Sequence, residues 1–537
     1  MKHVRILLVG LLFPVMVLSV NGYKSNRGRQ SGDSEDQAGN LSIGWASVNI
    51  TPDKPVLLAG QYHARVSEGV MDPVTTTVLA LESGEGENSE KALLISCDLI
   101  NISDGTRDQV GKSLRKTVRD KLTKTIPGLT SGQIILNATH THSAPYCSSE
   151  PDSKSIYGVE LDAMAPYECL EFISERIVEA GKKAWNNRKP GGISYGLGHA
   201  VVGHNRLAIY SSGKSQMYGN TNRKDFIHIE GFEDHSVNLL YTWDKNSKLT
   251  GIVVNVACPA QVSEQIYEVS ADYWHDARLE IRERLGDDLF ILPQCSAAGD
   301  QSPHFMIGNK AEGRMQRLIN PDATTGRGSI GRRKQIAVSI ADAVSSVCPY
   351  MKDQIEWAPA FVHRMEGVEL SRRLLSPDDV SNALKEAEGY KKHYDELLAA
   401  IQENPSIKQK QGWSFDITST YSQMNRGLIV KDRYELEKVQ PKMVVEVHVI
   451  RLGDIVFATN PFELYLDYGM RIKGRSPAVQ TFLVQLAGSG TYVPTSRSIT
   501  GGGYGAVPAS TLIGTKGGEE LVEKTLEMIN AVWHNNE

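Results

Sequence analysis

The sequence predicts an α+β fold in which mixed β-sheets are flanked by helices. Segments with strand character and segments with helical character interleave along the chain. The chain has 537 residues, 40% hydrophobic and 23% charged, which is typical of a globular protein with one large domain or two to three smaller ones. Because no internal repeat interrupts the interleaving, we expect one large unit whose sheets bury their apolar faces against helices.

The first 42 residues precede this unit. Residues 1–22 combine a basic start with an apolar run from Ile6 to Val20, the pattern of an export signal, and that run is shorter than the roughly 20 residues a membrane span needs. Residues 23–42 are rich in Ser, Gly, Asn, Asp and Gln and predict a flexible spacer. We therefore expect an exported protein, periplasmic or secreted, whose folded unit covers residues 43–537 and has no transmembrane span.

Charge and cysteine content exclude two classes of protein. The formal net charge is -5, so no overall basic surface indicates a nucleic acid partner. Six cysteines in 537 residues are too few for a disulfide-rich scaffold, although an exported protein can hold a bridge.

Short apolar or alternating runs bounded by turn residues predict the strands. They lie at 42–50, 75–81, 92–97, 134–136, 237–243, 249–257, 289–293, 444–452 and 455–459. Turns at 244–247 and 453–454 join two pairs of these strands into hairpins.

Helical spacing of apolar residues predicts the helices. They lie at 108–122, 167–186, 273–285, 330–347, 380–403 and 519–533. Composition changes over 376–440, where Ser376-Pro377-Asp378-Asp379 is a helix start. We interpret this segment as a helical insertion, which serves as a lid, as an oligomer contact or as a solvated structural arm.

His140 and His142 form the first candidate site. They follow the apolar run Ile134–Leu136, a predicted buried strand, and residues two apart on a strand point to the same face. Neutral imidazoles are good ligands for zinc and similar ions, so a pair at a strand end can begin a metal site. The alternative is a pair of histidines that only form hydrogen bonds within the structure.

Four further stretches place reactive side chains in loops after predicted strands. They contain Cys258, Asp300 with Ser302, Glu463, and Tyr492 followed by Tyr504. Each has a purely structural interpretation as well, since Asp300 can belong to a simple turn, Glu463 can cap a helix and Tyr492 can lie in the core.

Together with the histidine pair, these stretches resemble the neutral ceramidase family, the zinc-dependent N-acylsphingosine amidohydrolases. The resemblance runs from about Gly44 to the C-terminus, in matching order. Its most specific part is Ala138-Thr139-His140-Thr141-His142-Ser143, which is close to the family's THTHSGP. The other matching segments are Gly44–Pro52, Asn205-Arg206, Gly299–Pro303 (the family's GDVSPN), Asn460–Glu463 (P-G-E-F), and Tyr492–Thr495 with Tyr504 (Y-x-T-T and a second tyrosine).

The resemblance implies a zinc site and an amide-cleaving centre. The family's zinc ligands fall on His140, Glu463 and Tyr492, and its catalytic serine falls on Ser302. His142 is implied to lie beside the metal and to orient or shuttle a proton. Tyr504 is implied to stabilise the developing oxyanion, and Asn205 and Arg206 to bind substrate. Zinc in such a site polarises a carbonyl and lowers the pKa of a bound water to about 7.

The sequence departs from the family at the second zinc histidine, which stands in a His-Pro step. Here that step is Cys258-Pro259, and four interpretations remain open. Cys258 replaces the histidine as a thiolate ligand, which suits zinc; His275 supplies the ligand instead; the metal is lost and Ser302 or a carboxylate performs different chemistry; or Cys258 pairs with Cys295 in a disulfide. His304 also stands where the family has asparagine, which changes the surroundings of Ser302.

The leading hypothesis is an exported, metal-assisted hydrolase that resembles neutral ceramidase and cleaves an amide or other acyl bond of a small molecule, a lipid or a glycan. One alternative is a glycoside hydrolase or carbohydrate deacylase on the same scaffold. Asp300 and Glu463 would then be its acid/base pair, with carboxyl groups roughly 5 to 10 Å apart. The other alternative is a non-catalytic binding protein that kept the fold.

Overall fold

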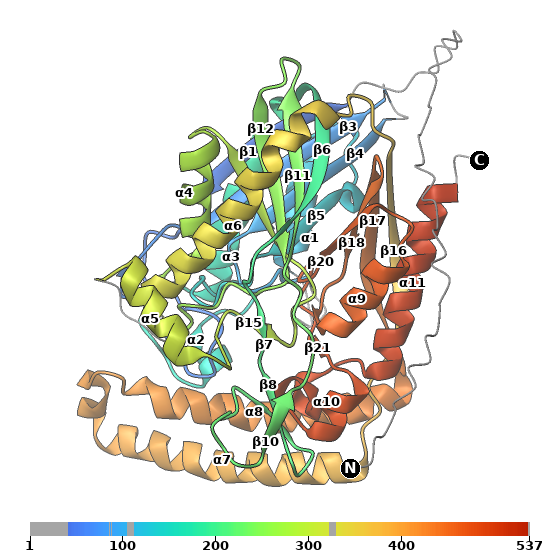
Figure 1. Cartoon of the computed structure of the whole chain (residues 1–537). Helices are drawn as coiled ribbons and strands as arrows, with labels where there is room; N and C mark the ends of the chain where they lie inside the picture. Colours follow the sequence, from blue (N-terminus) through green and yellow to red (C-terminus); the bar gives the residue numbers. More distant parts are fainter. Residues whose placement is uncertain (1–40, 85, 87–88, 105–111, 322–328, 535–537) are drawn as a thin grey trace, which may run out of the picture. The chain divides into compact units, whose positions relative to one another are not determined.

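Two β-sheets packed face to face form the centre of the structure (Figure 1). The computed structural model describes residues 41–84, 86, 89–104, 112–321 and 329–534. The larger sheet has eight strands in the order β14-β12-β11-β6-β1-β3-β4-β5, and the smaller one has four in the order β16-β17-β18-β20. Both sheets mix antiparallel and parallel neighbours, the parallel pairs being β12 with β14, β4 with β5, and β18 with β20.

The strands of the larger sheet are, from edge to edge, β14 (Phe290–Cys295), β12 (Leu249–Val256), β11 (Ser236–Asp244), β6 (Lys189–His199), β1 (Ser42–Asn49), β3 (Thr75–Ser83), β4 (Glu90–Cys97) and β5 (Ile134–Ala138). Those of the smaller sheet are β16 (Phe361–Ser371), β17 (Lys442–Leu452), β18 (Ile455–Thr459) and β20 (Gln480–Val484).

Alternation along the strands gives each sheet two buried faces. In β11, Leu239 and Tyr241 pack against helices, whereas Leu240 between them faces the smaller sheet. Phe457 of β18 and Phe482 of β20 meet Leu240 in the same apolar cluster, which fills the space between the sheets. Nearly continuous apolar runs in these strands follow from burial on both sides.

Helices cover the two outer faces, so the layers run helix, sheet, sheet, helix. The larger sheet is covered by α1 (Leu114–Thr125), α3 (Pro166–Asn186), α4 (Tyr273–Leu285) and α6 (Ile330–Met351). The smaller sheet is covered by α9 (Leu466–Arg475) and α11 (Thr515–His534). Gly44 permits this packing, because a Cβ there would lie 2.0 Å from the Ala184 carbonyl oxygen of α3.

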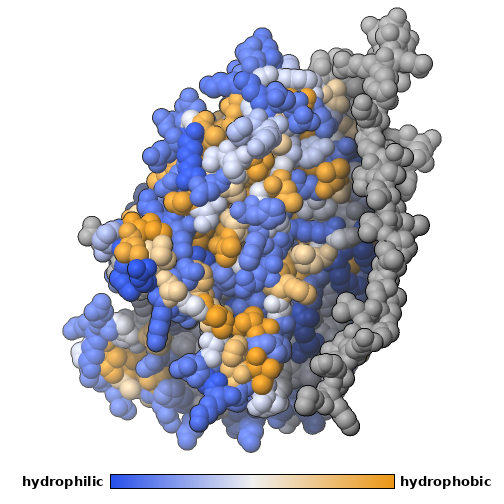
Figure 2. Space-filling model, viewed as in Figure 1, coloured by the Kyte–Doolittle hydropathy of each residue, from blue (hydrophilic) through white to orange (hydrophobic). Residues whose placement is uncertain are grey.

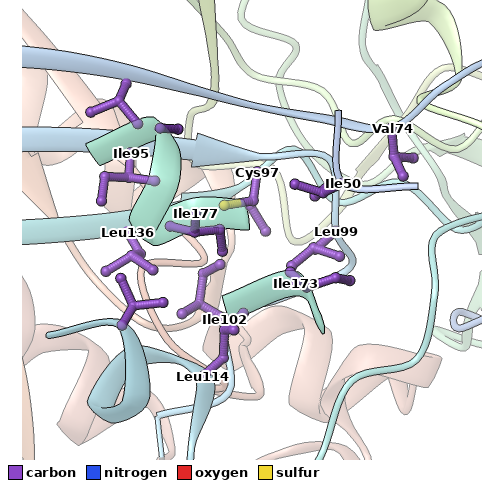
Figure 3. Close-up of a cluster of buried hydrophobic side chains, with 14 of the residues drawn as sticks. Ile50, Val74, Ile95, Cys97, Leu99, Ile102, Leu114, Leu136, Ile173 and Ile177 are labelled. Atoms are coloured by element: carbon purple, nitrogen blue, oxygen red, sulfur yellow. The ribbon is translucent and has the colours of Figure 1, made fainter. Parts of the chain in front are cut away.

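Figure 3 shows the part of the core that supports the start of the candidate site. Ile95 and Cys97 of β4 and Leu136 of β5 pack against Ile173 and Ile177 of α3. Leu99 and Ile102, in the loop after β4, lie in the same cluster. The loop that follows β4 is therefore held in place by apolar contacts just before it meets the chain leaving β5.

A hairpin of two long helices, α7 (Pro377–Glu403) and α8 (Ser414–Val439), lies between β16 and β17 in the sequence. The Ser376 side chain accepts from the backbone of Asp379 and the Asp379 side chain accepts in return, which is a capping box at the predicted helix start. Gly427 lets the helices touch, since a Cβ there would lie 2.6 Å from the Ala383 carbonyl oxygen.

Short elements complete the loops. The short strands are β2 (Gly69–Val70), β7 (His204–Asn205), β8 (Leu207–Tyr210), β9 (Ser215–Met217), β10 (Phe226–Ile229), β13 (Glu268–Val269), β15 (Gln301–Ser302), β19 (Glu463–Leu464) and β21 (Tyr492–Val493). The short helices include α2 (Ser153–Tyr157), α5 (Asn309–Ile319), α10 (Ser496–Gly501) and the 3-10 turns η5 (Tyr504–Ala506) and η6 (Pro508–Ser510). On the face shown in Figure 2, apolar residues form small patches separated by polar side chains, while the larger apolar clusters lie inside.

The structure confirms the predicted α+β class with mixed sheets and flanking helices, and both predicted hairpins. The helix expected at 108–122 begins later, at Leu114, after the capping residue Ser113, and residues 105–111 lie outside the described ones. The predicted export signal and the spacer up to residue 40 also lie outside them. Leu41 is buried and Ser42 begins β1, so the fold includes the last two residues of the predicted spacer. Within the described residues, no helix combines the length and the apolar character that a membrane span requires.

Candidate active site

His140 lies just after β5, where the chain leaves the larger sheet. Its Nδ1 atom is 2.6 Å from the carbonyl oxygen of Ile100, in the loop that the apolar core holds after β4. Because a carbonyl oxygen only accepts, this contact assigns the ring proton to Nδ1. The lone pair on Nε2 is therefore available to a ligand, the arrangement that metal-binding histidines commonly have.

The rings of His140 and His142 meet, with centroids 4.9 Å apart and planes at 86°. They do not meet by alternation along a strand, and that prediction is wrong. The strand ends at Ala138, and His140 adopts a positive φ of 64°, which turns the backbone between the two histidines. The pair is thus formed by a bend that the sequence pattern does not specify.

Glu463 and Tyr492 reach His140 from the C-terminal part of the chain. They are directly paired residues of the parallel strands β19 and β21. The Glu463 Oε2 atom lies 3.4 Å from His140 Nε2, and the Tyr492 hydroxyl hydrogen-bonds to the same carboxylate. Burial alone raises the pKa of the Glu463 carboxyl, but the neighbouring His140, the hydrogen bond from Tyr492 and the nearby Arg206 outweigh it and lower the pKa to about 2. The carboxylate therefore stays ionised.

Arg206 contacts the same Tyr492 hydroxyl that is hydrogen-bonded to Glu463. Its Nη2 atom donates to the Tyr492 hydroxyl at 3.2 Å and to the Gly299 carbonyl oxygen at 2.9 Å. The Arg206 side chain is 6% exposed, so its charge lies inside the structure beside the Glu463–Tyr492 pair. The two sequence-predicted groups Arg206 and Tyr492 are thus in direct contact.

Asp300 and Asn205 form a buried structural contact next to Arg206. The Asn205 Nδ2 atom donates to one oxygen of the Asp300 carboxylate at 2.8 Å, and the backbone N–H of Leu466 donates to the other at 2.9 Å. Leu466 is the first residue of α9, so Asp300 ties Asn205 to the start of that helix. Burial raises the pKa of Asp300 to about 6. Because both oxygens already have fixed donors, this geometry disfavours Asp300 as the mobile acid or base of a glycosidase.

Ser302 lies fully buried in β15, which pairs with β7. Its hydroxyl oxygen accepts from the Tyr218 hydroxyl at 3.1 Å and from the backbone N–H of His304 at 3.1 Å. The side-chain amide of Gln261 donates to the Tyr218 hydroxyl at 2.8 Å and lies 3.2 Å from the Glu264 carboxylate, to which it also donates. A chain of hydrogen bonds therefore leads from Ser302 to Glu264.

Glu264 connects this chain to His142. One carboxylate oxygen lies 3.3 Å from His304 Nε2, and the other lies 3.9 Å from His142 Nδ1. Both ring nitrogens of His142 are buried and have no hydrogen-bond partner, which is uncommon for a buried polar group. Burial, and then the neighbouring His140, lower the pKa of His142 to about 3. His142 is thus a neutral imidazole at the centre of the site, and neither its N–H nor its lone-pair nitrogen has a hydrogen-bond partner.

Tyr504 closes the opposite side of the site. Its ring lies edge-on to Tyr492, with centroids 5.7 Å apart. Its hydroxyl is hydrogen-bonded to the hydroxyl of Tyr62, and the guanidinium of Arg426, on α8, lies over both of these rings. The hairpin of α7 and α8 therefore contributes to the surroundings of the site.

Comparison with solved structures identifies the scaffold. The neutral ceramidase from Pseudomonas aeruginosa matches with a TM-score of 0.63 at 15% identity, over 92% of this chain and 74% of that one. A ceramidase complexed with C2 matches with a TM-score of 0.59 at 14% identity, over 92% of this chain and 75% of that one. The chain has the neutral ceramidase fold. Its sequence alone matches no family model and no curated protein.

Within this neutral ceramidase fold, Cys258 lies in an apolar environment. It is fully buried in the cluster formed by the larger sheet with α4 and α6, and its thiol donates to the Pro259 carbonyl oxygen at 3.4 Å. Burial raises the pKa of the thiol well above its ordinary value. All six cysteines are free thiols, so no disulfide joins Cys258 to Cys295. His275, the other predicted substitute, lies in the first turn of α4.

Two of the predicted ligands, His140 and Glu463, have a separation that is compatible with a zinc ion. Among the described residues, no group of three or more His, Cys, Asp or Glu side chains is arranged to hold a metal. His140 and Glu463 do meet, and Tyr492 adds a phenol oxygen. Two ligands at about 2.0–2.1 Å from a tetrahedral zinc ion lie about 3.3–3.4 Å from each other. The separation of 3.4 Å between His140 Nε2 and Glu463 Oε2 agrees with that geometry.

Sequence reasoning did not identify Tyr62, Tyr218, Glu264 and Arg426, four side chains that the structure places around the predicted residues. Glu264 follows Gln261 by three positions in the loop after β12, and that loop was singled out for its cysteine. A search for titratable residues along the whole loop would have found it. Tyr62 and Arg426 lie in segments without a chemical motif, so only the fold reveals them.

Proposed function

We propose that this protein is a hydrolase of the neutral-ceramidase type that cleaves an amide or other acyl bond. The observation that carries the proposal is the meeting of His140, Glu463 and Tyr492 beside the unpaired, buried imidazole of His142. A buried polar group without a partner calls for an explanation, and a catalytic role or a bound ion is among those that such groups have.

The proposal includes one zinc ion held by His140 Nε2, Glu463 and Tyr492. When bound there, zinc would polarise the substrate carbonyl and lower the pKa of a water molecule. Cys258 is left out of the ligand set, because its thiol is buried in apolar surroundings.

We assign proton transfer and stabilisation of the oxyanion to side chains of the protein. His142 accepts a proton at a free ring nitrogen, and the Glu264 carboxylate 3.9 Å away stabilises the imidazolium that forms. Ser302 is held by Tyr218 and the His304 N–H, close to the same carboxylate through Gln261. The Tyr504 hydroxyl is directed into the site by Tyr62 and can donate to the oxyanion of a tetrahedral intermediate.

The substrate class is a small molecule or lipid with an acyl group. Because the predicted signal at residues 1–22 has the pattern of an export sequence, we place the activity in the periplasm or outside the cell. The engaged carboxylate of Asp300 argues against the glycosidase alternative.

The test is an acyl-release assay on a panel of N-acyl amides and esters, with zinc content measured by mass spectrometry. Chelator treatment should abolish release and zinc should restore it. Glu463→Gln and Tyr492→Phe should lose zinc as well as activity, whereas Tyr350→Phe, with a tyrosine 74% exposed on α6, should keep both. Full activity after complete zinc removal would reject the metal, and no release from any amide or ester would reject the hydrolase.

A further inference from the structure

Arg426 projects from α8 to the edge of the candidate active site. Its guanidinium carbon lies 5.1 Å from the ring centroid of Tyr62 and 5.2 Å from that of Tyr504. Its Nη2 atom donates to the Ser510 hydroxyl at 3.0 Å. The three side chains Tyr62, Tyr504 and Arg426 are all half-buried, so they remain accessible to a ligand that enters the site.

The charge of Arg426 has no counter-charge in the part of the chain that the structure describes. Among the residues that the structure describes, no carboxylate lies within the 4.0 Å that defines an ion pair with this guanidinium, and its contacts are two rings and one hydroxyl. Arg373 lies near the same segment, the one that follows Tyr504 and contains Ser510. It also donates to neutral groups, namely the Ala506 carbonyl oxygen and the Thr511 hydroxyl. Partly buried charges without a counter-charge are costly, and a ligand of opposite charge removes that cost.

Arg426 is not needed to fasten α8 to the site. The Ser422 hydroxyl donates to the Tyr62 carbonyl oxygen at 2.7 Å, and the Ala64 N–H donates to the Thr418 hydroxyl at 2.9 Å. These neutral contacts already hold the loop containing Tyr62 on α8. The position of the guanidinium beside Tyr504 therefore calls for an explanation other than attachment of the helix.

The Tyr504 ring lies between Arg426 and Tyr492, which is one of the proposed zinc ligands. Tyr504 contacts Tyr492, and Tyr492 hydrogen-bonds to the Glu463 carboxylate. The buried cation of Arg206, on the other side of Tyr492, compensates the Glu463 carboxylate, so Glu463 does not cancel the charge of Arg426. With the acyl carbonyl near Tyr492, as in the proposed reaction, a substituent that extends past the Tyr504 ring reaches the guanidinium.

We propose that Arg426 binds a negatively charged group on the part of the substrate next to the scissile acyl bond. A carboxylate or a sulfonate has the required chemistry, since the planar guanidinium pairs with both. The inference rests on the proposed acyl hydrolysis and adds the substrate class: an anionic N-acyl compound. Arg426 is accordingly a specificity-determining residue contributed by the hairpin of α7 and α8.

The test compares matched substrates that release the same fatty acid. N-hexanoylglycine and N-hexanoyltaurine carry a carboxylate and a sulfonate, and N-hexanoylglycinamide is the neutral counterpart. We expect the wild-type protein to favour one or both anions by about 10- to 100-fold in kcat/KM, the range of a charged hydrogen bond. Arg426→Met should abolish this preference and Arg426→Lys should retain part of it. Lys431→Met, an exposed cation on the same helix, should retain it fully.

Calorimetric binding of the same three compounds to wild type and Arg426→Met separates this inference from the reaction. Anion-dependent binding that Arg426→Met removes supports the inference, even if none of the compounds is hydrolysed and the proposed reaction fails. Hydrolysis with equal kcat/KM for neutral and anionic compounds overturns the inference while the reaction stands. A preference that persists in Arg426→Met also overturns it, because the anion then binds elsewhere.

Discussion

Glu264→Gln tests the buried network more directly than any change to a sequence-predicted residue. The Glu264 carboxylate lies 3.9 Å from His142 Nδ1, and its charge favours the protonated form of that ring. Coulomb's law with an effective dielectric constant of about 20 gives about 4 kcal/mol for unit charges at this separation. Glutamine has the same shape but no charge, so His142 becomes a weaker base and the imidazolium formed during proton transfer loses this stabilisation.

The expected result is a fall in kcat/KM of about 10- to 1000-fold, the upper value corresponding to the full 4 kcal/mol. Steady-state kinetics measure the fall, and thermal melting of the same samples checks that the fold is intact. Glu280→Gln is the matched control, since Glu280 is a partly buried carboxylate on α4 that pairs with Arg284 and Lys334. A folded Glu264→Gln protein with kcat/KM within twofold of wild type would refute the proposed role of this carboxylate.

The remaining predictions concern single buried contacts. Tyr62→Phe removes the hydroxyl bonded to Tyr504 and should lower kcat/KM about 5- to 20-fold; unchanged kinetics beside the Tyr350→Phe control would contradict this. Asn205→Ala leaves one oxygen of the buried Asp300 carboxylate without its donor and should lower the free energy of unfolding by about 1–3 kcal/mol. Urea denaturation measures that loss, and a cost near zero speaks against the contact. Burial, with help from His448, lowers the pKa of His363 to about 3, while an unfolded histidine titrates near 6.5. The neutral folded ring therefore stabilises the protein above about pH 6.5, and this stability is lost as the pH falls from there towards 3. His363→Gln should flatten that part of the stability–pH curve, and an identical slope in urea titrations across this range would disprove the assignment.

The sequence predicts those elements whose local pattern and tertiary role agree. The hairpin of β17 and β18 has apolar strands around Gly453, which adopts the positive φ of 62° that a tight turn favours. The start of α7 at Ser376 is equally local, because the capping box lies within four residues. By contrast, β6 has no apolar pattern and contains Pro190 and several glycines, so only its pairing with β1 and β11 makes it a strand.

The candidate site, like the fold, could be predicted from the sequence only in part. The short spacing of His140 and His142 keeps them near each other, but the bend that brings their rings together depends on contacts of His140 with the loop after β4. The meeting of His140 with Glu463 could be expected from the resemblance to a family and from nothing local. Glu264 and Arg426 could not be expected at all, because their significance depends on which loops and helices pack around the site.

The pairing of β19 with β21 also governs when the site can exist. His140, Ser302 and Tyr492 come from widely separated parts of the chain, and contacts of such long range are formed late and slowly in folding. A chain cut just before Tyr492 contains every strand of the larger sheet but cannot present this carboxylate and phenol together. Turnover would then report that the last strands are in place, and a partly folded chain would be unable to cleave acyl bonds.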